Sequence, residues 1–249
     1  MTLYDLKIIN GKRQRVWNTG RCRGIEDYSK RIGHFSEEIK QAAEKSRVRV
    51  LDIGCGYGKA LLELKRLLGD GIETYGINLE PRWTLDLIKK FGLAEKIFTK
   101  HDIDNNLPKL YIGDSSMGLP YPSNYFDFII SVASMQYVPD KAKLLEECNR
   151  VLKKNGTCLI QHGFTKHHNV LEYKNQFEIW NKDGKLVNWQ AYLKIFKNIQ
   201  LKISKDKKWE YLILRKAKVF RVGLDLVSSI DIHQINPDWW GTKAIYRLK

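Results

Sequence analysis

The residues best suited to hold a ligand lie in one short stretch, Val48–Gly58, which reads VRVLDIGCGYG. Its first half alternates β-branched and apolar residues, which predicts a strand, and three glycines follow at every second position. Glycine lets the backbone turn tightly and approach a ligand without a Cβ in between. Asp52 falls at the carboxyl end of this strand, where ligands of open α/β sheets bind. With the helical pattern at Lys59–Leu68, the stretch predicts a nucleotide-type site.

The glycine spacing excludes two common phosphate-binding motifs. The stretch reads GxGxG and is led by an acid two residues before the first glycine. It therefore does not match the GxGxxG dinucleotide fingerprint, and it lacks the Lys-Ser/Thr pair of a phosphate-binding loop.

The stretch resembles motif I of the class I S-adenosylmethionine (SAM)-dependent methyltransferases, and later segments resemble the same family in the same order. LPYPSNYFD at Leu119–Asp127 is similar to the family's Leu-Pro-Phe-Pro turn and aromatic-Asp pair. It leads into the apolar run Phe128–Val132, which suits a strand buried on both faces. RVLKKNG at Arg150–Gly156 is similar to the family's turn after the next helix. The resemblance covers about residues 46–216.

The resemblance implies an α/β fold, a doubly wound seven-stranded mixed sheet of the Rossmann-like methyltransferase type. It also implies an enzyme that uses SAM as cofactor, and this chemistry needs no metal. We expect an N-terminal arm and lid helix at 1–45, a SAM-binding domain at 46–216, and a basic and aromatic C-terminal extension at 217–249 packed on the same domain.

Smaller patterns predict the remaining elements. We expect an irregular arm at 1–24, one amphipathic helix at 25–45 with a weak point at Gly33, and a tight turn at Asn155–Gly156. Other expected elements are a strand at 73–78, helices at 82–91, 141–152 and 187–197, a strand at 157–161, and a hairpin of 199–203 with 209–215.

By resemblance, the cofactor contacts follow the ends of the strands. The family usually carries an acid at the position of Asn78 to hold the ribose, and an amide there lacks charge assistance. Glu80, two residues on, could supply the carboxylate instead. Asp114 and Ser115 are expected at the adenine. The predicted cofactor-binding set is Asp52, Gly54, Cys55, Gly56, Asn78, Leu79, Glu80, Asp114, Ser115, Ser131 and Val132.

The adenine acid has two candidate positions. Two stretches, KIFTKHDIDNNLP and KLYIGDSSMGLPYP, each combine a strand-like run, an acid and Leu-Pro. Only the second continues into the buried strand, so we predict that Asp114 is the adenine acid and that Asp102 and Asp104 form an inserted turn.

The methyl acceptor is expected beyond the fourth strand and under the lid helix. Position alone makes Tyr28, His34, Ser134, Gln136 and Tyr137 substrate-side candidates, and ordinary packing is an equal alternative for the lid helix. His162 ends the fifth strand, and histidine has a pKa suited to a general base. It is a weak candidate, and the catalytic residues are otherwise unknown.

Charge leaves the acceptor open. The chain carries a net charge of +15, with +5 in residues 1–47, +1 in 48–163 and +9 in 164–249. Basic flanks favour an anionic partner, whereas solvated surface lysines are the simpler alternative. We therefore predict a small-molecule acceptor methylated on oxygen or nitrogen. RNA, gripped by the flanks with Trp17, Trp239 and Trp240, is the first alternative, and a non-catalytic SAM-binding protein is the second.

The composition also bounds the surroundings. The N-terminus lacks the pattern of a secretory signal, and no apolar run is long enough to span a bilayer. Four cysteines without metal-ligand spacing suggest reduced thiols, so we expect a cytoplasmic protein with no metal site. The sequence leaves the oligomeric state unknown.

Overall fold

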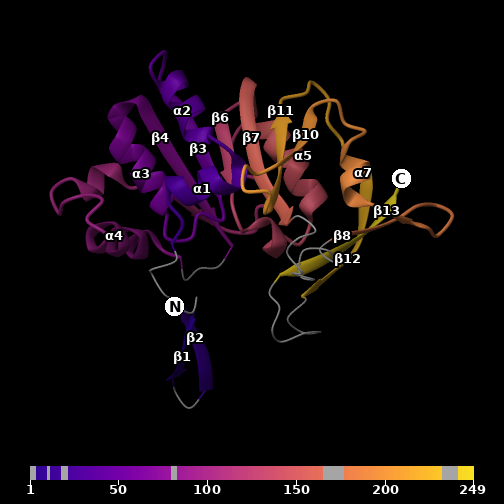
Figure 1. Ribbon diagram of the computed structural model, residues 1–249, viewed down its shortest axis with the longest axis horizontal. Helices are drawn as coiled ribbons and strands as arrows, with labels where there is room; N and C mark the ends of the chain where they lie inside the picture. The colour runs from indigo at the N-terminus through magenta and orange to yellow at the C-terminus, as the bar shows by residue number, and fades with distance from the viewer. Residues whose placement is uncertain (1–3, 10–11, 18–21, 80–82, 165–176, 232–240) are drawn as a thin grey trace.

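A computed structural model describes residues 4–9, 12–17, 22–79, 83–164, 177–231 and 241–249. Its strands form sheets of seven, four and two strands. Figure 1 shows the seven-stranded sheet at the centre of the molecule with helices on both faces.

The seven-stranded sheet has the predicted doubly wound order, β10-β11-β7-β6-β3-β4-β5. The five strands from β7 to β5 pair in parallel, and β11 runs antiparallel to both β7 and β10. This confirms the expected mixed α/β fold. The strands are β3 (Val48–Ile53), β4 (Ile72–Asn78), β5 (Lys109–Ile112), β6 (Phe126–Ser131), β7 (Leu152–Phe164), β10 (Ile199–Ile203) and β11 (Trp209–Arg215).

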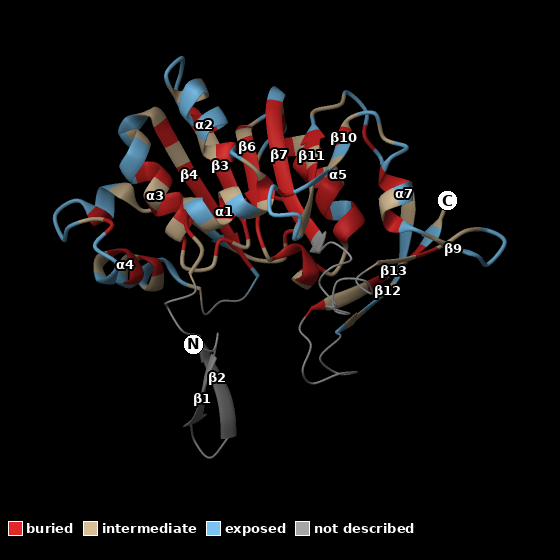
Figure 2. Cartoon of the chain, viewed as in Figure 1, coloured by how far each residue is buried: buried red, intermediate tan, exposed pale blue. Residues whose placement is uncertain are grey.

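Helices cover both faces because the central strands are apolar on both sides, as Figure 2 shows by their burial. On one face, α1, α2 and α3 pack over a core cluster that includes Val50, Ile130 and Leu159. On the other, α5 and α7 pack over a cluster that includes Leu51 and Ile160. The helices are α1 (Ile25–Ile32), α2 (Phe35–Ala43), α3 (Lys59–Leu68), α4 (Leu85–Ala94), α5 (Lys141–Val151) and α7 (Trp189–Leu193).

The lid helix expected at 25–45 is two helices, so that prediction was wrong. Gly33 ends α1 with φ of +82°, a left-handed conformation that favours glycine, and α2 begins after His34. The break turns the chain, so that α1 crosses the sheet and α2 leads into β3.

The expectation of an irregular N-terminal arm was also wrong. Strands β1 (Tyr4–Ile9) and β2 (Lys12–Trp17) pair antiparallel, in register from Tyr4 with Trp17 to Ile9 with Lys12. The two residues between them in the sequence are Asn10 and Gly11, a pair typical of two-residue hairpin loops.

A four-stranded second sheet contains the strands of the C-terminal extension. Its order is β12 (Leu224–Asp231), β13 (Thr242–Leu248), β8 (Phe177–Trp180) and β9 (Leu186–Val187). Ile179, Ala244 and Tyr246 bury its inner side in the same cluster as α5. The C-terminal extension therefore pairs, through β13, with β8, a strand that comes before β10 and β11 in the sequence.

Three local boundaries differ from the sequence-based expectations. Asn155–Gly156 lies inside β7, where the pairing with β6 jumps from Leu152 to Thr157, so the extra residues form an irregularity in the strand. The helix expected at 187–197 is only α7, and the helix expected at 82–91 is α4. The remaining predicted helices, strands and hairpin are present.

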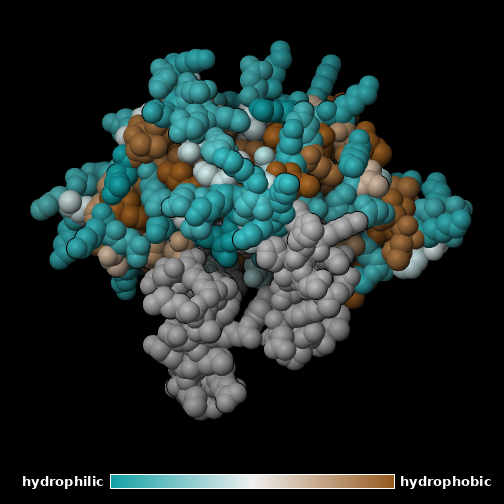
Figure 3. Space-filling model, viewed as in Figure 1, coloured by the Kyte–Doolittle hydropathy of each residue, from teal (hydrophilic) through white to brown (hydrophobic). Residues whose placement is uncertain are grey.

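The surface of this arrangement is largely polar. On the face seen in Figure 3, hydrophilic side chains predominate, with smaller apolar patches between them. Within the described ranges, none of the helices has the length and apolar character needed to cross a membrane.

Candidate functional site

The glycine turn lies directly after β3 and is held against the end of β4. Gly54, Gly56 and Gly58 all have positive φ. The amides of Gly54 and Cys55 both donate to the carbonyl of Ile77, at 2.7 and 3.2 Å. A Cβ on Gly54 would lie 2.2 Å from Cβ of Ser134, so the loop approaches the end of β6 more closely than a side chain would permit.

Gly56 differs from the other two glycines because no atom of the described residues lies within 4 Å of the position of a Cβ. The space in front of its backbone is open, as a ligand cradle requires. The side-chain amide of Asn78 bonds to both backbone polar groups of Gly56. Its Oδ1 accepts from the Gly56 amide at 2.8 Å, and its Nδ2 donates to the Gly56 carbonyl at 3.2 Å. Asn78 therefore stabilises the conformation of the glycine turn. Its expected contact with a ribose stays a prediction.

Asp52 is fully buried and only partly hydrogen-bonded. The hydroxyl of Tyr28, on α1, donates to its Oδ2 at 2.7 Å, whereas Oδ1 has no partner among the residues that the structure describes. Burial raises the pKa of Asp52 to about 7, against the lowering effect of the Tyr28 hydrogen bond. An unpartnered buried carboxylate oxygen is costly, and such oxygens are uncommon away from ligand sites. Tyr28, expected on the substrate side, thus bonds to Asp52, the acid predicted to bind the cofactor.

The polar residues at the end of β6 and just after it bond to nearby protein groups. The hydroxyls of Ser131 and Ser134 both donate to the carbonyl of Ile53, at 3.0 and 2.7 Å, and join the ends of β6 and β3. Gln136 Nε2 donates to the carbonyl of Ala133 at 2.9 Å. Val132 is buried in the apolar cluster beneath α1. These residues connect the ends of β3 and β6 at the predicted site. Their expected contacts with a ligand stay predictions.

The predicted adenine end has the expected strand order. β5 immediately precedes Gly113 and Asp114, whereas Asp102 and Asp104 belong to a short 3-10 segment, as predicted. Asp114 Oδ1 accepts from the amide and hydroxyl of Ser116, at 2.8 and 2.7 Å. Ser115 is buried, and Leu79 is 47% exposed at the end of β4.

The remaining candidates are placed less directly at the site. The Cys55 thiol is buried, and a Cβ on Gly76 would lie 2.6 Å from its sulfur, so only the backbone of Cys55 borders the loop. His34 is exposed at the start of α2, and Tyr137 is half-buried after β6. Glu80 lies outside the described residues.

His162 and its neighbour Gln161 form a second group of buried, unpartnered atoms. Within the described part of the chain, neither ring nitrogen of His162 has a hydrogen-bond partner, and Gln161 Nε2 also has none. Burial lowers the pKa of His162 to about 4, so the ring is neutral near pH 7. The sequence analysis missed Gln161. Its signal was a polar residue at the carboxyl end of a buried strand, just before the candidate histidine.

Together, the described residues suit the methionine and sulfonium end of SAM. The unpartnered Asp52 oxygen can accept from an ammonium group, and the open backbone at Gly56 leaves room for the ligand. Among the described residues, no three His, Cys, Asp or Glu side chains are grouped as metal ligands.

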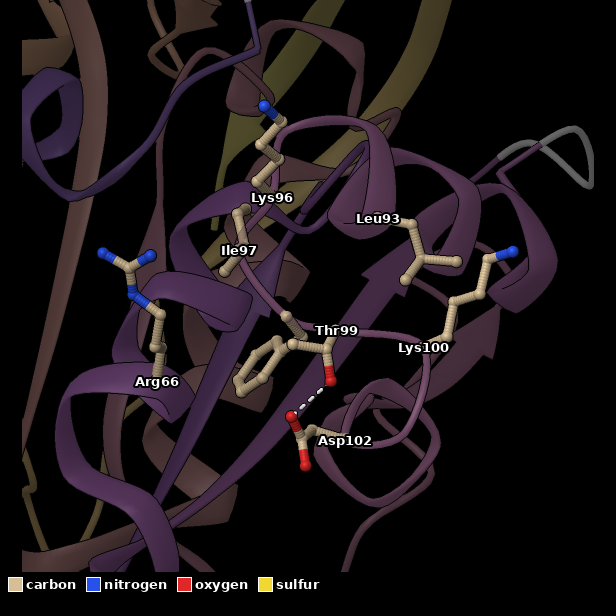
Figure 4. Close-up of a pocket in the computed structure, with 8 residues that line it drawn as sticks. Arg66, Leu93, Lys96, Ile97, Thr99, Lys100 and Asp102 are labelled. Carbon is tan, nitrogen blue, oxygen red and sulfur yellow. Dashed lines mark hydrogen bonds between the residues drawn. The ribbon is translucent and has the colours of Figure 1, made fainter.

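Figure 4 shows a pocket of the described surface and the residues that line it. It has a volume of about 590 Å³ and lies where the end of α4 meets α3. Its lining residues include Arg66, Lys96, Lys100 and Asp102, and the Thr99 hydroxyl donates to Asp102 at 2.5 Å. The pocket contains none of the predicted site residues.

Comparison with protein families identifies the class. A family profile described as "Methyltransferase domain" matches residues 51–160. The matched residues run from the end of β3 through the glycine turn, β4, β5, β6 and α5 into β7. Residues 51–160 therefore form a methyltransferase domain, which confirms the resemblance to the class I SAM-dependent methyltransferases and the expectation of an enzyme that uses SAM.

Individual relatives are distant. The chain is 28% identical over 123 residues to ajmaline N-methyltransferase of Rauvolfia serpentina, a match that covers 49% of this chain and 38% of the relative. It is 23% identical over 192 residues to demethylmenaquinone methyltransferase of Lysinibacillus sphaericus, covering 77% and 73%. A solved SAM-dependent methyltransferase from Aquifex aeolicus is 18% identical with a TM-score of 0.48, covering 72% and 97%. The chain thus spans less than half the length of the first of these.

Proposed function

We propose that the protein transfers a methyl group from SAM to an oxygen or nitrogen nucleophile of a small molecule. The buried Asp52 carboxylate beside the open glycine turn carries this proposal, because one of its oxygens has no protein partner. Bound SAM supplies an electrophilic methyl group on its sulfonium.

Each end of the cofactor would meet a different part of the site. Asp52 Oδ1 would accept from the ammonium of the methionine part, and the backbone from Gly54 to Gly58 would lie along the sulfonium. Asp114 and Ser115 would hold the adenine. Because the Asn78 amide is occupied by Gly56, we assign the ribose to Glu80.

A small acceptor agrees with the names of two relatives, ajmaline N-methyltransferase and demethylmenaquinone methyltransferase. The first of these names specifies a nitrogen acceptor. The RNA alternative depends on charge, and Trp239 and Trp240 lie outside the described residues.

Replacing Gly56 tests the cofactor site. In Gly56→Val the new side chain would fill the open space and strain a backbone with φ of +54°, so we expect SAM affinity to fall by at least about 100-fold, measured by titration calorimetry. Gly69→Val is the matched control, because Gly69 has φ of +51° and equally open space but lies at the far end of α3. Unchanged affinity in Gly56→Val, or equal loss in both variants, would refute the site.

A further inference from the structure

The end of β7 carries a β-bulge at His162. In the pairing of β7 with β11, Gln161 is opposite Tyr211 and Gly163 is opposite Glu210, so His162 has no partner residue on β11. One extra residue on one strand interrupts the alternation of side chains, and bulges of this kind often redirect a side chain beside an active site.

Two neighbouring residues at the bulge have buried polar atoms with no hydrogen-bond partner among the described residues. His162 is 3% exposed and Gln161 is 2% exposed. The orientation of the Gln161 amide is fixed, because its Oε1 accepts from the Ala133 amide at 3.1 Å and from Arg31 Nη1 at 3.4 Å. Its unpaired Nε2 is therefore a hydrogen-bond donor. The neutral imidazole of His162 offers one N–H group and one lone pair.

The register of the sheet places this bulge beside the cofactor site. Asp52 is paired with Ile130, and Ile130 is paired with Leu159, so the bulge begins two residues beyond the level of Asp52 and two strands away. Neighbouring strands are about 4.8 Å apart, so the lateral separation is about 10 Å. A cofactor on the glycine turn would thus leave the bulge on the acceptor side.

The backbone between the bulge and the second sheet is held in a strained conformation. Ala133 has φ of +54°, and the side chains of Gln161 and Gln136 bond to its amide and carbonyl. The Thr242 hydroxyl donates to the carbonyl of Gln136 at 3.2 Å. Non-glycine residues keep such a conformation only where their surroundings fix it, and these cluster at active sites and ligand clamps.

We propose that Gln161 and His162 bind the methyl acceptor and that the acceptor bears a hydroxyl group beside a second oxygen. This inference rests on the proposed function. Gln161 Nε2 donates to the second oxygen, and the lone pair of His162 accepts the hydroxyl proton.

In the transfer step, the acceptor O–H bond breaks, and the proton moves to the imidazole nitrogen of His162. The oxygen electron pair forms the bond to the methyl carbon as the carbon–sulfur bond breaks, and its electron pair stays on sulfur. The products are a methyl ether, S-adenosylhomocysteine and an imidazolium, which returns its proton to water.

The test uses labelled SAM with two acceptors that carry vicinal oxygens, catechol and 2′-hydroxyacetophenone, and with aniline as an amine control. We expect the wild-type protein to methylate at least one of the oxygen acceptors and not aniline. Calorimetry with SAM is run in parallel on every variant. Absence of SAM binding would overturn the proposed function, whereas SAM binding without transfer to either oxygen acceptor would overturn this inference alone.

Two variants separate the roles of the residues. His162→Gln keeps a hydrogen-bond acceptor but takes up no proton, so kcat should fall about 100-fold with little change in KM. Gln161→Glu keeps an acceptor for the Ala133 amide but removes the donor, so KM should rise about 10-fold. His101→Gln is the matched control on an exposed histidine outside the predicted site. Unchanged kcat in His162→Gln, or transfer to aniline that matches transfer to catechol, would contradict the assignment.

Discussion

Two buried charged side chains at the carboxyl edge of the sheet have opposite hydrogen-bonding states. Asp52 and Lys141 are both 0% exposed. Lys141 Nζ donates to the carbonyls of Val138 and Thr242 at 2.8 and 2.9 Å and to the Thr242 hydroxyl at 3.1 Å, so all three of its protons have acceptors. Asp52 has a partner for one oxygen and none for the other.

Burial alone does not separate these two residues. It raises the pKa of Asp52 to about 7 and lowers the pKa of Lys141 to about 7, in each case toward the neutral form. The difference lies in the number of partners. Lys141 joins α5 to the start of β13 and so attaches the second sheet, whereas Asp52 keeps an acceptor for a ligand. Buried charges with complete hydrogen bonding indicate structure, and incomplete ones indicate a site.

The largest effect on stability is expected from Lys141→Met. The substitution leaves the carbonyl of Thr242 without its donor and releases β13 from α5, so the free energy of unfolding should fall by about 2–4 kcal/mol. Urea denaturation measures the change, with Lys143→Met, an exposed lysine on the same helix, as control. A loss no greater than that of the control would show that Lys141 does not hold the sheet.

Asp52→Asn should weaken SAM binding without lowering stability, the reverse of the effect expected for Lys141→Met. The amide still accepts from Tyr28 but loses the charge, so SAM affinity should fall about 10–100-fold, because a hydrogen bond to a charged group is worth about 1.5–3 kcal/mol. Stability at pH 8 should not fall, since the variant removes a buried carboxylate with an unpaired oxygen. Calorimetry and thermal unfolding measure the two effects, with exposed Asp70→Asn as control. Full SAM affinity in the variant would mean that Asp52 is structural.

The dependence of stability on pH gives the smallest and most specific test. Between about pH 4 and 7 the folded state keeps a proton on Asp52 that the unfolded state has lost, so this residue makes stability fall as pH rises. Between about pH 7 and 10.5 the unfolded state binds the Lys141 proton and the folded state does not, so stability rises with pH. Each contribution has a slope of at most about 1.4 kcal/mol per pH unit.

Each variant should flatten only its own part of this curve. Asp52→Asn should alter the slope below pH 7 and leave the slope above it, and Lys141→Met should do the opposite. Chemical denaturation at intervals of one pH unit measures both slopes. A variant that changes both parts equally would show that the two residues are not independent.

The sequence predicted the part of the fold that local chemistry defines. Alternating apolar residues and closely spaced glycines led to β3, the glycine turn and Asp52, and the stretch that continues into Leu119–Asp127 contains β5 just before Asp114. The residues that make up each of these patterns are close together in the sequence, so each pattern could be recognised without knowledge of tertiary contacts.

Other features depend on contacts between distant parts of the chain. Thr242 is 101 residues from Lys141, and a lysine at the start of a helix would ordinarily be exposed. The bulge at His162 depends on its register with β11, which one strand alone does not define. The two hydrogen bonds between Asn78 and Gly56 likewise could not be predicted, because the sequence places the amide but not its partner.

The central claim is that a SAM-type ligand lies on the glycine turn and completes the hydrogen bonding of Asp52. A crystal structure of the protein with S-adenosylhomocysteine tests it most directly. We predict that the amino group of the ligand lies within hydrogen-bond distance of Asp52 Oδ1 and that its sulfur lies next to Gly56. A ligand bound elsewhere, with Asp52 Oδ1 still without a partner, would contradict the account.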